Sequence, residues 1–474
     1  MDLRFYNSMG RELQDFVSVR AGKVGMYGCG PTVYNYAHIG NLRTYIFEDI
    51  LRRVLEFAGY EVTHVMNVTD VGHLTDDADD GEDKMEKSAR ESGRSVWDIA
   101  EMFTGAFFHD TERLNILRPS VVCRATDHIA EMIGLVSRLE ERGFTYEAGG
   151  NIYFSIDKFP AYGRLALLDS QRLVAGARVE VDAGKRNPHD FVLWFTRSKF
   201  ENQTMVWDSP WGRGYPGWHL ECSAMSMRYL GEQFDIHCGG IDHIPVHHTN
   251  EIAQSEAATG KCPWVKYWLH GEFLIMDRGK MSKSRGGFLT LDRLVEEGFS
   301  PLDFRYFCLG GHYRSQLKFS FDGLASAASA RANLMERISR LDRGSSVSAG
   351  DSSCADSSFG EAAAGLLRDF EADIGDDLNM PKALADLWAL VKHQDIPDGE
   401  KLAAMQRMDR VLGLNLLEAR GVEALDSEIE ALIQERLGAR KAKNFARADE
   451  IRDILKGRGI LLEDSPDGTR WKRV

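Results

Sequence analysis

The sequence lacks long hydrophobic runs. Within its 474 residues, no uncharged apolar stretch approaches the roughly 18 residues that a membrane-spanning helix needs. The first dozen residues carry several charges and contain no apolar segment of the kind that directs secretion. These absences argue against an integral membrane protein and against a secreted one, so we expect a cytoplasmic protein with no membrane partner.

Cysteine is scarce as well. The chain contains 7 cysteines, an odd number, scattered along its length. This pattern argues against a disulfide framework and favours a reducing compartment, in which thiols remain available as metal ligands. Acidic residues outnumber basic ones by 72 to 58, which gives a net charge of -14. The surface as a whole is therefore not suited to polyanions, although a local basic patch is compatible with this balance.

The N-terminal part predicts a parallel sheet. Residues 22–28 form a short apolar run typical of a strand, and residues 42–60 repeat apolar positions three and four apart, as an amphipathic helix does. Residues 61–70 alternate and are rich in valine and threonine, which predicts a second strand. Such a βαβ unit binds ligands at the carboxyl ends of its strands, where GCGPTVYNYAHIGN, residues 28–41, is placed.

The following segments predict a catalytic domain that is split in sequence. Helical spacing extends over about 85–143, whereas residues 144–215 contain short segments rich in Gly, Pro and aromatics, which indicates a small β-containing insertion. Strand-like character returns at 234–242 and 267–277, where we expect the sheet to resume. The acidic stretch 75–84 is interpreted as a solvated loop with no metal role.

The C-terminal part differs in composition. Residues 344–363 are biased to Ser, Gly and Ala and predict a linker, and the helical spacing after them predicts a bundle. Residues 436–474 hold 11 Lys or Arg against 6 Asp or Glu, a local reversal of charge. With Phe445 and Trp471 among the bases, this tail suits nucleic acid. A charged helical hairpin that closes the bundle is an equally good interpretation.

Two short motifs suggest nucleotide chemistry. His38 and Gly40 stand at the start of the first predicted helix, where unpaired N–H groups and the helix dipole favour a phosphate. Taken alone, His38 could equally be a structural histidine that caps the turn. The segment KMSKS supplies Lys280 and Lys283, on a glycine-flanked loop able to close over a polyphosphate. Together the motifs resemble the class I aminoacyl-tRNA synthetases, which implies a Rossmann-like domain that binds ATP and activates an amino acid.

Four side chains of metal-binding type are Cys29, Cys222, His247 and Glu251. His247 and Glu251 are four residues apart, which places both on one face of a helix. Thiolate, imidazole and carboxylate are acceptable zinc ligands. Buried cysteines and surface histidines are common, however, and the spacing is not that of a compact zinc finger, so the residues alone leave the set open.

Longer stretches resemble the cysteinyl-tRNA synthetases from about residue 5 to the C-terminus: MYGCGPTVYNYAHIGN, ARVEVDAGKRNPHDFVLW, PGWHLECSAM, FDIHCGGIDHIPVHHTNEIAQ and GHYRSQLKFS. This resemblance implies that Cys29, Cys222, His247 and Glu251 hold one zinc ion (Zn2+) per chain beside the adenylation site, and that magnesium (Mg2+) accompanies ATP. It implies ATP, L-cysteine and tRNA(Cys) as partners and a monomer as the usual state.

Zinc would explain how the enzyme discriminates against serine. A pocket that selects by shape alone discriminates between near-isosteres by roughly 10- to 200-fold. Zinc binds a thiolate at ~2.3 Å and deprotonates a coordinated thiol, so the alcohol loses a strong bond. No editing site is then required.

The resemblance also assigns residues around the substrates. Those expected to line the cysteine pocket are Thr69, Trp218 and His237. Those expected to bind ATP are Gly40, Gly239, Gly240, Asp242 and Lys283. Those expected to stabilise charge during the reaction are His38, Asn41, Lys280 and Lys283. Those expected to contact tRNA are Arg440, Phe445 and Asp449.

Four positions depart from the family's pattern. The sequence His-Ile-Gly-His (HIGH) is usual in the family, whereas residues 38–41 read HIGN here. Asn41 must therefore do the work of the second histidine. Cys238 replaces a common glycine and could crowd the pocket or compete for metal, and Thr249 replaces a common acidic residue. Phe445 replaces a tryptophan seen in some members, which keeps base stacking but loses an indole hydrogen bond.

The predicted architecture is α/β: a Rossmann-like parallel-sheet catalytic domain with a small insertion, then an α-helical bundle and a small C-terminal anticodon-binding domain. The expected boundaries are 1–120 and 211–275 for the catalytic halves, 121–210 for the insertion, 276–343 for the KMSKS loop and stem-contact region, 344–423 for the bundle and 424–474 for the anticodon-binding domain. The expected function is cysteine–tRNA ligation. Two alternatives stay open: the cysteine ligase of mycothiol synthesis, whose acceptor is an amino sugar, and a nonenzymatic zinc-stabilised nucleic-acid-binding homologue.

Overall fold

The computed structural model describes residues 1–71, 84–168, 185–197, 204–276, 289–342, 359–417, 432–433, 435–440, 444–457, 460–465 and 468–473. Some predictions fall outside these ranges. They concern Lys280 and Lys283 of the KMSKS loop, most of the acidic stretch 75–84 and most of the linker 344–363.

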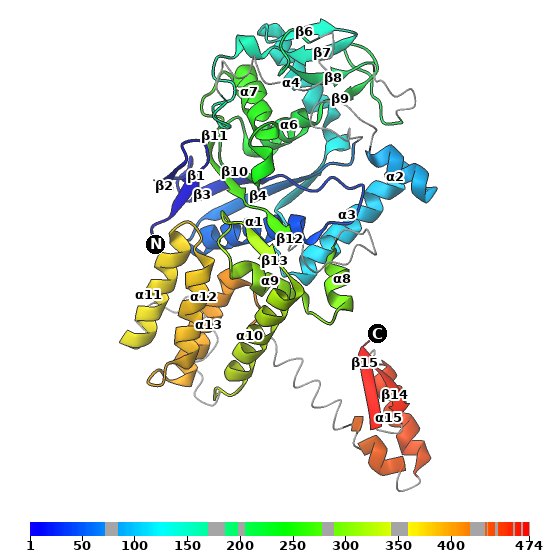
Figure 1. The fold of residues 1–474 in the computed structure, drawn as a ribbon, viewed down its shortest axis with the longest axis vertical. Coiled ribbons are helices and arrows are strands. Elements are labelled where there is room, and N and C mark those ends of the chain that lie inside the picture. Colours follow the sequence, from blue (N-terminus) through cyan, green and yellow to red (C-terminus); the bar gives the residue numbers. More distant parts are fainter. Residues whose placement is uncertain are drawn as a thin grey trace.

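A parallel sheet of five strands lies at the centre of the catalytic part (Figure 1). In spatial order the strands are β11 Val265–Gly271, β10 Phe234–Gly240, β3 Lys23–Gly28, β4 Glu61–Val68 and β5 Val121–Arg124. β10 pairs directly with β3, so both sides of the insertion contribute to one sheet, as the sequence predicts. The order reverses between β3 and β10, which is where the carboxyl ends of parallel strands open a ligand-binding crevice.

Helices cover both faces of this sheet (Figure 1). α1, Ile39–Phe57, buries its apolar face in a core that includes Met26 of β3. α6, Trp218–Leu230, and α7, His247–Thr259, share the opposite core with Tyr27. Because successive residues of a strand point to opposite faces, Met26 and Tyr27 serve the two cores in turn.

The predicted β-containing insertion is an antiparallel sheet of four strands: β6 Thr145–Ala148, β7 Asn151–Phe154, β8 Phe191–Phe195 and β9 Tyr215–Pro216. The stretch 85–143 is not wholly helical. It contains α2 Lys84–Ser92, α3 Val96–Arg113 and α4 Ile129–Glu141, but also β5 at the edge of the central sheet. The predicted domain boundary at residue 121 is therefore wrong for Val121–Arg124, which belongs to the catalytic sheet. A strand of four residues between helices is too short for its alternation of apolar and polar side chains to be recognised in the sequence.

The remaining elements surround the catalytic sheet or follow it. Short 3₁₀ turns are η1 Ala125–His128, η2 Ile156–Lys158 and η3 Ile241–His243. Small two-stranded sheets are formed by β1 Arg4–Asn7 with β2 Glu12–Asp15, and by β12 Leu274–Met276 with β13 Leu317–Phe319. The later helices are α8 Leu291–Glu296, α9 Pro301–Leu309, α10 Phe321–Ser339, α11 Glu361–Gly375, α12 Met380–Lys392 and α13 Asp398–Leu412.

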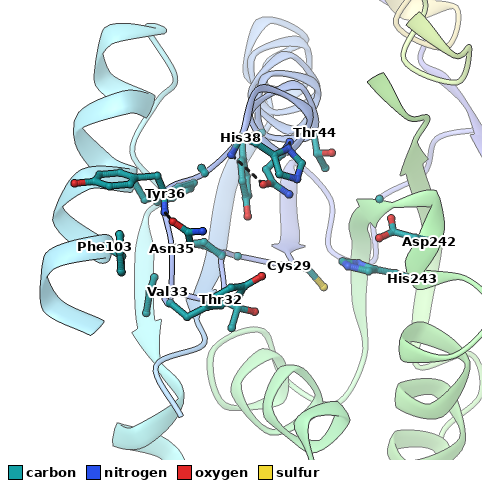
Figure 2. A pocket seen from close by; sticks show the side chains of 18 residues that line it. Cys29, Thr32, Val33, Asn35, Tyr36, His38, Thr44, Phe103, Asp242 and His243 are labelled. Atoms are coloured by element: carbon teal, nitrogen blue, oxygen red, sulfur yellow. Dashed lines mark hydrogen bonds between the residues drawn. The ribbon is translucent and has the colours of Figure 1, made fainter. Parts of the chain in front are cut away.

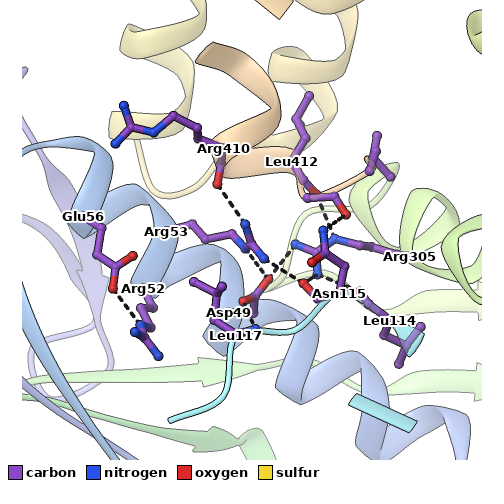
Figure 3. A network of polar contacts seen from close by, with 12 residues as sticks. Asp49, Arg52, Arg53, Glu56, Leu114, Asn115, Leu117, Arg305, Arg410 and Leu412 are labelled. Carbon is purple, nitrogen blue, oxygen red and sulfur yellow. Dashed lines mark hydrogen bonds and ion pairs between the residues drawn. The ribbon is translucent and has the colours of Figure 1, made fainter. Parts of the chain in front are cut away.

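A buried ion-pair network joins α1 to α9 and α13 (Figure 3). The Arg305 guanidinium lies 2.6 Å from Asp49 Oδ2, and Arg53 Nε lies 2.8 Å from the same oxygen. Arg305 also donates to the carbonyl of Leu412 at the end of α13. The helical bundle is thereby fixed to α1, the helix that begins within the HIGN motif, residues 38–41.

The basic C-terminal segment contains α15, Phe445–Gly457, followed by an antiparallel hairpin of β14, Ile460–Ser465, and β15, Gly468–Arg473. The helical-hairpin interpretation is therefore wrong for these residues, because two paired strands follow the helix. Among the described residues, no helix is both long enough and apolar enough to cross a membrane.

Candidate active site

His38 and Asn41 close the start of α1 as a reciprocal cap. The backbone N–H of Asn41 donates to His38 Nδ1 at 3.1 Å, and the backbone N–H of His38 donates to Asn41 Oδ1 at 3.2 Å. The capping role that the sequence left open for His38 is therefore present. Burial lowers the pKa of His38, so its ring is neutral near pH 7, and with Nδ1 as acceptor the ring proton stands on Nε2.

The residues that follow the KMSKS segment lie beside this turn. The N–H of Ile39 donates to the carbonyl of Leu289 at 2.8 Å, and His38 forms a β-bridge with Thr290. Residues 28–41 and the chain just beyond residue 288 are thus neighbours, although about 250 residues separate them in sequence. The chain that resumes at residue 289, after the KMSKS segment, therefore lies beside the start of α1.

A cavity of 370 Å³ opens at the carboxyl ends of β3 and β10 (Figure 2). Cys29 and the capped His38 line it, together with Asp242 and His243 from the end of β10. Figure 2 shows Cys29 between the HIGN turn and His243. Burial lowers the pKa of His243 to about 4, with a further lowering by His247.

The four predicted metal ligands come together at one end of this cavity. The donor atoms of Cys29, Cys222, His247 and Glu251 all lie within 4.8 Å of one another, and all four residues are buried. Cys29 directly follows β3, Cys222 comes from α6, and His247 and Glu251 come from successive turns of α7. His247 Nε2 lies 2.7 Å from Glu251 Oε1, as the four-residue spacing predicts.

The charges of this group suit a cation. A hydrogen bond from Cys29 lowers the pKa of Cys222 to about 6, against the effect of burial. Burial alone would raise the pKa of Glu251, yet His247 and His237 hold it at about 2. Cys222 and Glu251 therefore supply negative charge in a place where water is largely excluded, which is costly unless a cation or proton is shared among them.

A second, overlapping group contains Cys29, His237, His248 and Glu251, with donor atoms within the same 4.8 Å limit. His237 Nε2 lies 2.8 Å from Glu251 Oε2, so it holds the carboxylate rather than facing a substrate alone. His248 was not predicted as a member of the site. Its Nε2 lies 3.3 Å from Cys29 Sγ, and its Nδ1 lies 2.7 Å from His270 Nε2. The adjacent histidine pair in VHHTNE was the available signal.

The other predicted pocket residues lie around the same group. Trp218 stacks on His247, with ring centroids 4.1 Å apart and planes at 7°. The hydroxyl of Thr69 donates to Glu221 Oε2 at 2.9 Å. Glu221 is fully buried and was also missed, because a single glutamate next to Cys222 carries no motif. Burial raises its pKa well above the ordinary value, and Cys222 adds to that rise.

The glycines at the end of β10 make room for their own loop. A Cβ at Gly239 would lie 2.6 Å from His243 Nδ1, and one at Gly240 would lie even closer to Asp242 Oδ1. Side chains at these two positions would therefore displace the loop that carries Asp242. Gly40 lies in the first turn of α1, where a Cβ would approach the His38 ring to 3.0 Å.

Cys238 does not lie with the metal-binding groups of the described residues. Its thiol is completely buried, donates to the carbonyl of Tyr27, and belongs to the core that packs against α1. The expectation that it could compete for metal or crowd the pocket is therefore wrong. Thr249, the other departure in this region, donates its hydroxyl to the carbonyl of Ile244 at 2.7 Å.

The predicted tRNA contacts lie in the C-terminal segment. Arg440 and Asp449 are exposed, and Phe445 is the first residue of α15. Exposure is compatible with a contact to nucleic acid, and these three assignments remain predictions.

Comparisons with known proteins agree with this arrangement. Residues 15–329 match the family model of the tRNA synthetases class I (C) catalytic domain, and residues 422–471 match the cysteinyl-tRNA ligase anticodon binding domain. A cysteine–tRNA ligase of Treponema denticola is 56% identical over the full length of both chains. One of Treponema pallidum is 47% identical over the full length, and one of Burkholderia lata is 49% identical over 99% of this chain and 97% of its own.

Solved structures show the same fold at low identity. A methionyl-tRNA synthetase of Mycobacterium tuberculosis with bound methionyl-adenylate superposes with a TM-score of 0.53 at 17% identity, covering 83% of this chain and 88% of that one. The parallel sheet, the capped start of α1 and the full-length relatives all indicate the same family. The chain belongs to the cysteinyl-tRNA synthetases, a family of class I aminoacyl-tRNA synthetases.

Proposed function

We propose that this protein is a cysteine–tRNA ligase that activates L-cysteine with ATP and transfers it to the 3′ end of tRNA(Cys). The observation that carries the proposal is the buried group of Cys29, Cys222, His247 and Glu251 at the cavity that the HIGN turn also lines. Cys29 belongs both to this group and to the cavity lining, which supports a site for a substrate thiol beside a site for a nucleotide phosphate.

We propose zinc as the resident metal. Two thiol groups, one imidazole and one carboxylate fit its preference for sulfur and nitrogen ligands, and the lowered pKa values of Cys222 and Glu251 supply the required charge. When bound, zinc would coordinate the thiolate of the substrate, which a serine hydroxyl cannot match. Trp218, stacked on His247, would keep that ligand oriented and exclude water.

The chain's own residues would carry out the adenylation by positioning and charge stabilisation. A carboxylate oxygen of cysteine attacks the α-phosphorus of ATP, and the bond to the bridging oxygen breaks, which releases pyrophosphate. His38, held by Asn41, would donate from Nε2 to a phosphate oxygen. Lys280 and Lys283 would neutralise the polyphosphate, and magnesium, when bound with ATP, would supply further positive charge. Gly239, Gly240 and Asp242 would border the nucleotide.

In the second step a hydroxyl of the terminal ribose attacks the cysteinyl carbonyl, and AMP leaves. Arg440, Phe445 and Asp449 would hold the anticodon end of the tRNA. The match of residues 422–471 to an anticodon-binding domain favours tRNA over an amino-sugar acceptor, and it gives no support to a nonenzymatic homologue. We further propose that the enzyme acts as a monomer in the cytoplasm.

The test is ATP-dependent transfer of labelled cysteine to purified tRNA(Cys), with serine and an amino sugar in parallel reactions. Charging of the tRNA with cysteine alone supports the proposal. Transfer only to the amino sugar would overturn the acceptor, and absence of cysteine-dependent pyrophosphate exchange would overturn the activity.

A further inference from the structure

One wall of the cavity is aromatic and takes no part in the chemistry assigned above. Tyr36 lies two residues before His38 and is 48% exposed, whereas Phe103 of α3 is 8% exposed. Their ring centroids are 5.0 Å apart and their planes meet at 87°, an edge-to-face contact. Figure 2 shows this pair on the α3 side of the cavity, across from Asp242 and His243.

The exposed ring is held in place from two directions. Phe103 braces it through the edge-to-face contact, which such aromatic pairs favour. The backbone N–H of Tyr36 donates to Asn35 Oδ1 at 2.8 Å, which fixes the turn that carries the ring. A large aromatic side chain that is half-exposed, packed on a buried ring and part of a cavity wall offers a flat surface on which a nucleobase can stack.

Two substrates of the proposed reaction carry a nucleobase, namely ATP and the tRNA end. The described groups assigned to the nucleotide lie across the cavity from Tyr36 or further along the HIGN turn: Asp242 follows β10, and residues 289 and 290 contact Ile39 and His38. The thiol site occupies the Cys29 end. The α3 wall is therefore the side that remains for the second substrate to approach the cysteinyl carbonyl.

We infer that Tyr36, braced by Phe103, stacks on the base of the terminal tRNA nucleotide and positions its ribose hydroxyl for the transfer step. This inference rests on the proposed function and concerns its second step only. Stacking is insensitive to base identity, so it suits a tRNA end that carries no identity information of its own. Removing the ring is expected to slow transfer by roughly ten- to one-hundred-fold.

The experiment compares the two steps in the full-length enzyme with bound metal. The variants are Tyr36→Ala, Tyr36→Phe, and Trp97→Ala as a matched control, because Trp97 is 49% exposed on α3. The first readout is cysteine-dependent pyrophosphate exchange at varied ATP. The second is single-turnover transfer from preformed adenylate to tRNA(Cys), either intact or with an abasic terminal nucleotide that keeps its ribose hydroxyls.

We expect loss of the terminal base to slow the wild-type enzyme and the Tyr36→Phe and Trp97→Ala variants. Tyr36→Ala should transfer to both tRNAs at the same slow rate, with the KM for ATP changed less than threefold in the exchange assay. If loss of the terminal base slowed transfer by Tyr36→Ala as much as transfer by the wild type, the inference would be overturned. So would a raised KM for ATP with normal transfer, which would assign the ring to the adenine of ATP. Absence of exchange in the wild type would instead refute the proposed function.

Discussion

His38 and Asn41 satisfy each other's backbone N–H groups at the start of α1, with Nδ1 and Oδ1 as the two acceptors at 3.1 and 3.2 Å. In this chain the asparagine of HIGN is therefore a structural partner of the histidine. The backbone N–H of residue 41 fixes the tautomer of the histidine ring, and the asparagine side chain holds the backbone from which that ring faces the cavity.

Asn41→Ala removes one half of this cap. We expect a loss of about 1 kcal/mol in the free energy of unfolding, as for other caps, and a loss of pyrophosphate exchange larger than that destabilisation explains. Asn41→Asp keeps an acceptor oxygen and should retain most of the stability. Thermal unfolding and exchange rates measure the two effects, and full exchange activity in Asn41→Ala would contradict this role.

Gly28 makes room for Glu48. A Cβ at Gly28 would lie 2.5 Å from Glu48 Oε2, a buried carboxylate oxygen without a hydrogen-bond partner among the described residues. Gly28→Ala should therefore destabilise the protein by roughly 1–3 kcal/mol. The cost should shrink in the Glu48→Ala background, because the closest contact, that with the Glu48 carboxylate, is then removed. Additive effects in a double-mutant cycle by chemical denaturation would refute this steric explanation.

The Asp49–Arg305 ion pair predicts how stability depends on pH. Burial would raise the pKa of Asp49, but Arg305 and Arg53 together hold it below its ordinary value. A folded-state pKa below the unfolded one means that the carboxylate stabilises the protein fully above the unfolded pKa, near 4. That contribution is lost as the pH falls through the folded pKa.

Asp49→Asn should accordingly lower the melting temperature at pH 7 and flatten its decline between about pH 5 and 3. The loss at neutral pH should be large, about 3–5 kcal/mol, because Arg305 stays buried without its partner. Melting curves of both proteins across this range provide the test. Parallel pH profiles would show that Asp49 is not responsible.

Removal of residues 424–474 should separate the two steps of the proposed reaction. The deleted part holds α15 and the β14–β15 hairpin, whereas the cavity residues precede it. We expect pyrophosphate exchange to be retained and the KM for tRNA(Cys) to rise at least tenfold. Equal loss of both activities would mean that the segment stabilises the catalytic part instead.

Local patterns predicted the elements that carry the site. The β3–α1–β4 unit has clear periodicity, and the spacing of His247 and Glu251 on α7 placed two ligands on one helix face. Their partners Cys29 and Cys222 lie on separate segments. Residue type alone left this set of four open, and only the resemblance implied that they form one site. The sequence pattern alone could not have done so, because the contacts depend on how β3, α6 and α7 meet.

The misses have the same physical origin. β5 is only four residues long, and its pairing with β4 depends on the tertiary structure. Its sequence shows no alternation that would predict a strand. His248 and Glu221 act through buried contacts to Cys29 and Thr69, which lie more than 150 positions away in sequence. The cap by His38 was left open as an interpretation, whereas its reciprocal partner Asn41 was not predicted, because an asparagine three residues after a histidine is not a usual capping pattern.

The most direct test of the account measures zinc content and amino-acid selectivity together. The proteins compared are the wild type, Cys222→Ser and, as a control, Cys308→Ser, which alters a buried cysteine outside the metal-binding groups of the described residues. We predict one zinc per chain in the wild type and in Cys308→Ser, with pyrophosphate exchange supported by cysteine and not by serine. Cys222→Ser should lose the zinc and the cysteine-dependent exchange together. Full zinc occupancy in Cys222→Ser, or serine activated as well as cysteine by the wild type, would contradict the account.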